Sequence, residues 1–230
     1  MAGQVVVQMR VPKISLVIGL QTQIDNDLCR YYKYKRQEPQ IQSPTTCTVS
    51  FMVVPSVQGM GIGKATFAMD RGYDDNKMFL KLDELGQEYV IRLTSKRKLL
   101  YHNKWTPATE LRNRRKGKVK TNVFYKGKDH EAYLSHVKVQ ITASRKNIYL
   151  VLVYGITEHP MMLATNKEIT SKEDVIKVAR TYFSRWKIEE YFRCKKQMFQ
   201  FENFRVRKLC AINALNFYIT LCMAFLAMIS

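Results

Sequence analysis

The sequence predicts an α/β fold with a β-rich insertion, and three observations support this class. A strand, helix and strand pattern of apolar residues runs from Thr66 to Leu93. Alternating apolar and polar residues at Tyr133 to Ile141 and at Ile148 to Tyr154 are typical of antiparallel strands. A capping pattern at Ser171 then opens a long helical segment.

Residues 1 to 64 have the least regular pattern. Three of their segments are rich in β-branched residues, which favours strands. These segments are Val5 to Met9, Ile14 to Leu20 and Thr46 to Val54. The stretch Gly59 to Lys64 invites a phosphate-loop reading, but Gln58 stands where that motif needs Gly, and Ala65 where it needs Ser or Thr. We therefore expect a flexible turn there.

The segment after residue 64 predicts a strand, a helix and a second strand. The first strand covers Thr66 to Met69 and ends in Asp70, and the second covers Glu88 to Leu93. The helix, Asn76 to Leu85, places four apolar residues on one face, and Gly86 is a natural C-terminal cap. These four are Met78, Phe79, Leu82 and Leu85. Because sites in open α/β sheets form at the carboxyl ends of strands, Asp70 is a candidate site residue.

The rest of the chain predicts a β-rich segment followed by helices. From Thr94 to about Asn166 we expect antiparallel strands, with the basic stretch Arg112 to Lys120 as a loop or hairpin. Ser171 and Asp174 form a capping box that opens a helix to about Phe199, and a second helix covers roughly 206 to 229. The end of this second helix is apolar but carries two asparagines and a threonine, which favours a buried helix over a membrane span.

The charge of the chain points to an anionic partner. Thirty-eight Lys and Arg oppose nineteen Asp and Glu among 230 residues, which gives a net charge of +19. Nucleic acid is the leading partner and an acidic membrane surface the second. The five cysteines are scattered and never spaced as CxxC, so we expect reduced thiols in a cytoplasmic protein without structural zinc. Length and cysteine count exclude a secreted disulfide scaffold.

Five polar residues gather on one face of the helix that begins at Ser171. Tyr182, Arg185, Glu189 and Lys196 lie at relative positions 0, 3, 7 and 14, within a sector of roughly 40–60°, and Arg193 lies beside them. This face is either a site or a solvated surface with an Arg185–Glu189 ion pair.

The same spacing, Tyr182-x2-Arg185-x3-Glu189-x6-Lys196, resembles the Y-R-E-K signature of bacterial insertion-sequence transposases of the DDE class. The string Arg185 to Phe192 is similar to the arginine-tryptophan, isoleucine-glutamate and phenylalanine pattern of that family. Upstream, Asp70 to Asp74 and then Tyr89 to Leu93 resemble the block around the family's second catalytic aspartate. The resemblance covers about 66 to 229.

The resemblance implies an RNase H-like catalytic core in which two aspartates and a glutamate hold Mg²⁺ or Mn²⁺. It implies metal-dependent DNA strand cleavage and strand transfer, with Asp70 as the second aspartate and Glu189 as the glutamate. It also implies DNA contacts from Tyr182, Arg185 and Lys196, to which we add Arg193. Transposases of this kind generally act as dimers, so a homodimer on DNA is expected, and no membrane partner.

The first catalytic aspartate of the family has no counterpart in the two blocks that match. The upstream acids besides Glu38 are Asp25 and Asp27, which we take as candidates for the third metal ligand. We expect residues 1 to 64 to be a degraded, frameshifted or recombined N-terminal part, and 65 to 230 to be the catalytic core with its insertion at about 94 to 166. The alternative is a DNA-binding remnant that assembles no metal site.

The insertion is the most basic part of the chain. Its cations lie beside aromatic residues, which favours DNA contact over a solvated surface. We select Arg114, Arg115 and Lys116 as DNA-binding residues. The aromatic residues are Tyr101, Trp105, Phe124 and Tyr125.

Overall fold

The structure of the chain is a computed structural model that describes residues 5–8, 65–141, 145–200, 203, 205 and 208–229. The chain divides into two compact units. The first unit comprises Met1–Gln8 and Lys64–Lys187, and the second comprises Met9–Gly63 and Ile188–Ser230. The expected strands at 14–20 and 46–54, the expected turn at 59–64, and both Asp25 and Asp27 lie outside the described residues. The expected domain boundary at residue 64 remains a prediction.

Nine strands in the described part of the chain form one mixed sheet in the first unit. They are β1 (Val5–Gln8), β2 (Thr66–Met69), β3 (Glu88–Arg92), β4 (Lys98–Tyr101), β5 (Lys104–Pro107), β6 (Val119–Tyr125), β7 (Lys128–Ile141), β8 (Lys146–Tyr154) and β9 (Met161–Thr165). Their order is β1-β2-β3-β9-β8-β7-β4-β5, and β6 pairs with β7. The β2–β3 pair is parallel, while the others are antiparallel.

The predicted helical segments at 76–85, 171–199 and 206–229 occur in that order, and the structure adds two short helical segments before residue 171. The first unit contains the 3₁₀ turn η1 (Arg71–Tyr73), α3 (Asn76–Glu84), α4 (Ala108–Asn113) and α5 (Lys172–Ser184). The helix α6 (Trp186–Met198) crosses into the second unit, which also contains α7 (Leu209–Ile229). Together these elements confirm the α/β class and the β-rich segment before α6, the helix that carries Glu189. The architecture is consistent with an RNase H-like fold.

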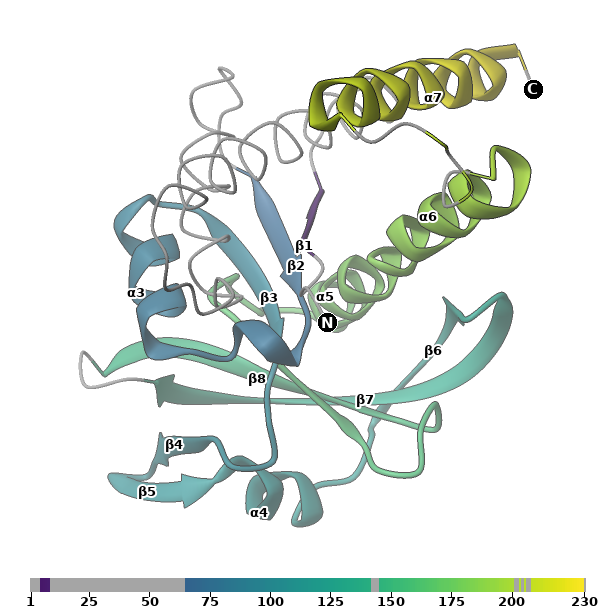
Figure 1. Cartoon of the computed structure of the whole chain (residues 1–230). Coiled ribbons are helices and arrows are strands. Elements are labelled where there is room, and N and C mark those ends of the chain that lie inside the picture. Colours follow the sequence, from purple (N-terminus) through teal and green to yellow (C-terminus); the bar gives the residue numbers. More distant parts are fainter. Residues whose placement is uncertain are drawn as a thin grey trace. The chain divides into compact units, whose positions relative to one another are not determined.

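Side-chain alternation along β3 gives each face of the sheet its own helix (Figure 1). On one face the ring of Tyr89 meets the ring of Phe79 from α3, with centroids 5.3 Å apart. On the other face Val90 belongs to a buried cluster with Val175 and Val178 of α5. The strand β3 therefore lies between two packed layers.

Local signals account for the ends of both helices that cover the sheet. Ser171 and Asp174 form the predicted capping box of α5, in which the Ser171 side chain accepts from the Asp174 N–H. Hydrogen bonds from the Ser171 side chain and from the Thr170 and Ser171 backbone lower the pKa of Asp174 to about 2. Gly86 follows α3 with a φ of 64°, a left-handed conformation that suits glycine at a helix C-terminus.

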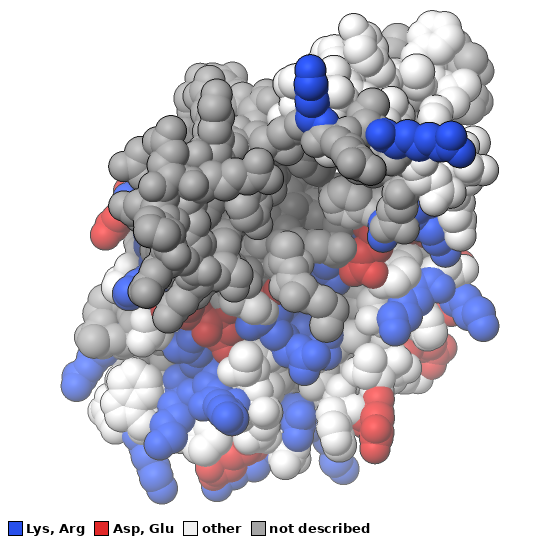
Figure 2. Space-filling model, in the orientation of Figure 1, with Lys and Arg blue, Asp and Glu red and all other residues white. Residues whose placement is uncertain are grey.

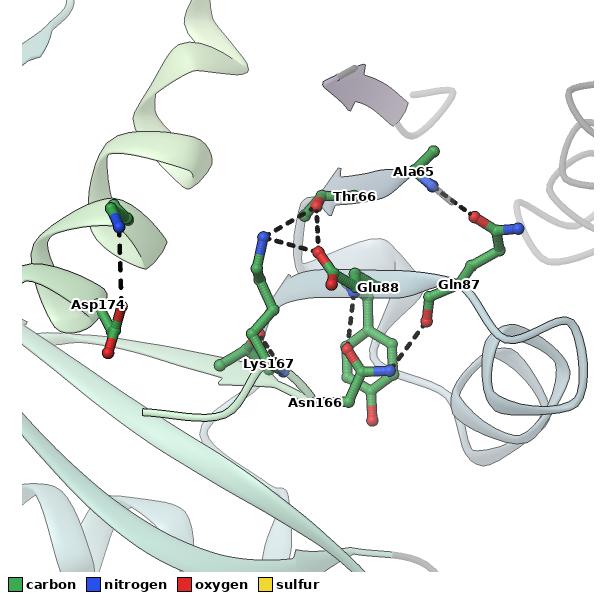
Figure 3. A network of polar contacts seen from close by, with 10 residues as sticks. Ala65, Thr66, Gln87, Glu88, Asn166, Lys167 and Asp174 are labelled. Carbon is green, nitrogen blue, oxygen red and sulfur yellow. Dashed lines mark hydrogen bonds and ion pairs between the residues drawn. The ribbon is translucent and has the colours of Figure 1, made fainter. Parts of the chain in front are cut away.

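A polar network joins the amino ends of β2 and β3 (Figure 3). The Glu88 carboxylate accepts from the Thr66 hydroxyl at 2.8 Å and pairs with the Lys167 ammonium at 2.7 Å. The Asn166 side chain accepts from the Tyr89 N–H and donates to the Gln87 carbonyl. This network fixes the parallel pair at the end opposite to Asp70.

The prediction of one continuous helix after Ser171 is wrong. The helix expected from Ser171 to about Phe199 is divided at Arg185, whose N–H bonds to the Tyr182 carbonyl three residues earlier, as in a 3₁₀ turn. The basic stretch Arg112–Lys120, expected as a loop or hairpin, contains a loop between the end of α4 and the start of β6, which agrees with the first of these two alternatives.

The prediction that the C-terminal helix is buried is also wrong for one face of α7. Ile219 and Thr220 are buried, but five large apolar side chains are exposed. These are Phe217, Tyr218, Leu221, Phe225 and Leu226. In the part of the chain that the structure describes, no helix has the length and apolarity needed to span a membrane. Cys194, Cys210 and Cys222 are free thiols.

Candidate functional site

Asp70 stands at the carboxyl end of β2, as predicted. It is half-buried, and its backbone is extended at φ −80° and ψ −175°, so it continues the strand by one residue. Its Oδ1 accepts a hydrogen bond from the Gly72 N–H at 2.9 Å and thereby caps η1. This hydrogen bond holds the Asp70 carboxylate at the carboxyl end of β2.

A second carboxylate, Asp74, holds this turn in place. Its Oδ2 accepts from the Thr94 N–H at 2.7 Å and from the Thr94 hydroxyl at 2.8 Å. Its Oδ1 pairs with the Arg97 guanidinium at 2.6 Å, and the Asp74 side chain is fully buried. The adjacent Asp75 accepts a hydrogen bond from the Lys77 N–H as the N-cap of α3.

Arg92 lies beside Asp70. In the parallel β2–β3 pair Met69 is level with Ile91, so Asp70 is level with Arg92. Alternation places Arg92 on the face of Val90, which is covered by α5. There the positive charge of Arg92 acts on the Tyr182 hydroxyl and favours a lower pKa of that group.

Tyr182 is buried, with only 2% of its surface exposed. The prediction that it is presented on a polar helix face is therefore wrong, because its ring packs in the core beneath α5. Burial raises the pKa of its hydroxyl, although the charges and hydrogen bonds of Arg92 and Arg185 oppose this rise. The Arg185 guanidinium lies 5.9 Å from the Tyr182 ring centroid. The charges of both Arg92 and Arg185 thus act on the Tyr182 hydroxyl.

Three predicted site residues lie on α6 in the second unit. Glu189 is half-buried, while Arg193 and Lys196 are exposed. Arg193 lies 3.9 Å from the carboxylate of Glu190, one turn earlier on the same helix. Asp70, Tyr182 and Arg185 belong to the first unit.

Polar contacts fix α6 against α7 within the second unit. Lys195 is 3% exposed, and its ammonium donates to Asn216 Oδ1 at 2.5 Å and lies 4.7 Å from the Tyr191 ring centroid. The hydroxyls of Tyr191 and Thr220 are 2.9 Å apart. These bonds set the rotation of the helix that carries Glu189.

The donor atoms of the predicted site suit a hard cation. Asp70 offers a carboxylate on a half-buried edge, and carboxylate oxygens are the ligands that Mg²⁺ prefers. Among the described residues, no group of three or more His, Cys, Asp or Glu side chains is arranged to hold a metal ion.

The basic residues selected from the insertion differ in their surroundings. Arg114 is exposed and pairs with Glu110, and Lys116 is exposed. Arg115 is half-buried, and its Nη1 donates to the His136 carbonyl at 3.0 Å. Figure 2 shows Lys and Arg side chains gathered across the lower part of the view, over β4, β5 and α4, with fewer acidic side chains among them.

Two of the four aromatic residues in this region are available at the surface. Trp105 is 45% exposed and Phe124 is 51% exposed, as stacking on a ligand requires. Tyr125 packs against Phe183 and Trp186 instead, with centroids 5.4 and 5.7 Å apart. Tyr101 is half-buried.

Sequence reasoning missed Arg92 and Tyr154. Arg92 ends the strand that follows Asp70, and this position at the carboxyl end of a neighbouring strand is a signal that could have identified it. The Tyr154 hydroxyl bonds the backbone of the basic stretch at Arg115 and Arg112, and no pattern in the sequence indicates that contact.

The comparisons with known proteins agree with this architecture. The family model described as Transposase DDE domain matches residues 54–225, which include β2 to β9, α5 and α6. No curated protein shows significant similarity to the chain. Since the match spans most of the chain, from before β2 with Asp70 at its end to beyond α6 with Glu189, this protein belongs to the Transposase DDE domain family.

Proposed function

We propose that this chain catalyses metal-dependent DNA strand cleavage and strand transfer in the transposition of an insertion sequence. Membership in a transposase family supports the role, and the observation that carries it is Asp70 at the carboxyl end of β2, level with Arg92. In this proposal Asp70 and Glu189 are catalytic carboxylates and bind Mg²⁺ or Mn²⁺. When bound, such ions activate a water or hydroxyl nucleophile and stabilise the leaving oxygen.

The side chains around Asp70 have separate tasks in this proposal. Arg92 and Arg185 bind the phosphate next to the cleaved bond, since guanidinium groups match phosphate oxygens in charge and shape. Tyr182 orients both guanidiniums through its buried hydroxyl and makes no direct DNA contact of its own. This places the predicted tyrosine in a supporting role.

Further residues extend the DNA contact. Arg193 and Lys196 are exposed on α6 and bind the backbone farther from the cleaved bond. Asp25 or Asp27 supplies the remaining metal ligand. A homodimer bound to the two ends of the element completes the proposed complex.

Cleavage assays on duplexes taken from both flanks of the coding sequence test the assignment. We expect cleavage with Mg²⁺ or Mn²⁺ and none with a chelator. Asp70→Asn and Glu189→Gln lower the rate more than about 100-fold, since even supporting residues of metal sites contribute 10- to 100-fold. DNA affinity in the chelator stays unchanged.

Glu190→Gln is the matched control, because it removes a neighbouring carboxylate of the same helix and should retain cleavage. If Asp70→Asn and Glu189→Gln both cleave at the wild-type rate, the catalytic assignment is wrong. If the wild-type chain binds DNA and cleaves none of these duplexes with either ion, the alternative of a DNA-binding remnant replaces the proposal.

A further inference from the structure

The basic loop, defined as Arg112–Lys118, is tied to the sheet at both ends. The Tyr154 hydroxyl on β8 lies 2.8 Å from the Arg115 carbonyl and 3.1 Å from the Arg112 carbonyl. The Lys118 N–H donates to the Leu134 carbonyl of β7 at 2.8 Å. The loop is therefore held by two neighbouring strands and has a defined shape in the free protein.

Arg115 faces the protein. Its Nη1 donates to the His136 carbonyl at 3.0 Å, and its Nη2 lies 3.4 Å from the Tyr101 hydroxyl. Its guanidinium also lies 6.0 Å from the centroid of the Tyr101 ring. Although sequence analysis grouped Arg115 with Arg114 and Lys116, its contacts are those of a residue that fastens the loop.

Gly117 allows the loop to approach β7 closely. A Cβ at this position would lie 2.4 Å from the Tyr133 Cβ and 2.8 Å from its carbonyl carbon. Real Cβ atoms do not approach backbone atoms so closely, so any other residue would push the loop away from the strand. The glycine thus contributes to the shape of the loop through close packing.

Lys116 and Lys118 are the exposed cations of this loop that remain for a ligand. The residues from Lys116 to Lys120 alternate between exposed and half-buried, which places both lysines on one side of the chain. The neighbouring cations have acidic partners, since Arg114 pairs with Glu110 and Lys120 with Glu131. With the described residues, neither Lys116 nor Lys118 forms an ion pair.

We propose that the basic loop is a preformed binding site for DNA phosphates, with Lys116 and Lys118 as the contacting residues and Arg115, Gly117 and Tyr154 as positioning residues. The inference rests on the proposed function only in taking DNA as the ligand. A loop that is ordered before binding loses less conformational entropy in the complex. Lysine contacts to phosphates hold the DNA backbone and carry no sequence information.

Equilibrium binding to a duplex of arbitrary sequence, in a chelator and across a salt series, tests the contacts. Each phosphate neutralised contributes about 0.9 to the slope of log affinity against log salt. We expect Lys116→Gln/Lys118→Gln to reduce that slope by about 2. The control Lys77→Gln/Lys172→Gln removes two exposed charges elsewhere and should leave the slope nearly unchanged.

Substitution of the positioning residues should change the DNA affinity without changing its salt slope. Tyr154→Phe and Arg115→Gln should lower affinity about three- to tenfold, as expected for loss of one hydrogen bond, with the slope unchanged. The bound loop still contacts the same phosphates, but it must be ordered on binding. In the free protein, trypsin should cleave after Lys116 or Lys118 slowly in wild type and faster in Tyr154→Phe.

Three results would overturn the inference. The first is an unchanged slope in Lys116→Gln/Lys118→Gln, and the second is a slope loss of about 1 in Arg115→Gln, which would make Arg115 a contact. The third is a Tyr154→Phe variant with wild-type affinity and wild-type resistance to trypsin. Binding that depends on these lysines without any cleavage would refute only the catalytic proposal. DNA cleavage by a protein whose salt slope does not depend on Lys116 and Lys118 would refute only the proposal for the basic loop.

Discussion

Asp74 and Arg97 form a buried ion pair, 2.6 Å between oxygen and nitrogen, directly behind the turn that carries Asp70. Arg97 also donates to the Asn76 side chain at 2.5 Å and lies over the Phe79 ring, 5.5 Å from its centroid. The pair connects the turn after β2 with the segment after β3. It therefore fixes the relative position of Asp70 and Arg92 at the ends of those strands.

Asp74→Ala should lower the free energy of unfolding by about 3 kcal/mol, because it leaves a largely buried guanidinium without its main carboxylate. Urea unfolding measures this loss. Asp75→Ala is the control on the adjacent residue and should lower the free energy by about 1 kcal/mol, the value of a helix N-cap. Equal losses in the two variants would show that Asp74 is only another cap.

Tyr182→Phe should slow DNA cleavage while preserving the fold. The variant keeps the ring in the core but removes the hydroxyl on which the charges of Arg92 and Arg185 act, so the stability should change by no more than about 1.5 kcal/mol. The test is the cleavage rate at saturating DNA, with Tyr149→Phe as a control on β8. A wild-type rate in Tyr182→Phe would leave the tyrosine with a packing role alone.

Local patterns predicted the elements around the site because their causes lie within a few residues. The Ser171–Asp174 capping box and Gly86 mark helix ends through neighbouring backbone groups, and the apolar spacing of α3 predicted its buried face. The burial of Tyr182 was also present in the sequence. Val175, Val178 and Ala179 precede it at helical spacing and extend one apolar stripe to Tyr182.

Contacts between distant parts of the chain could not be predicted in this way. Arg92 reaches Tyr182 because β3 and α5 pack together, and neither local pattern contains that information. Charge density located the basic loop, but it gave Arg114, Arg115 and Lys116 the same role. Only the fold distinguishes Arg115, which bonds β7, from the exposed cations on either side of it.

The stability of the chain should fall in mild acid partly because of His136. Burial, and then the nearby charge of Arg115, lower its pKa from the ordinary value of 6.5. The unfolded chain therefore takes up a proton more readily than the folded one, so protonation favours unfolding once the pH falls below about 6.5. Above that pH both states are neutral at this residue, and the effect disappears.

Urea unfolding at pH 7.5 and pH 5.5 measures this effect. His136→Gln should lose less stability between the two pH values than wild type does. Arg115→Gln should also reduce the difference, since it removes one of the two causes of the lowered pKa. If wild type and His136→Gln lose equal stability between pH 7.5 and pH 5.5, His136 makes no contribution.

Asn216→Leu should destabilise the contact between α6 and α7. The substitution removes an acceptor from the buried Lys195 ammonium, which lowers the free energy of unfolding by about 1–3 kcal/mol. Lys195→Leu/Asn216→Leu removes the ammonium together with this acceptor and should recover part of that loss. Because α6 carries Glu189, cleavage should fall in Asn216→Leu and recover in the double variant. A single variant as stable as wild type would mean that this bond does not hold the helix.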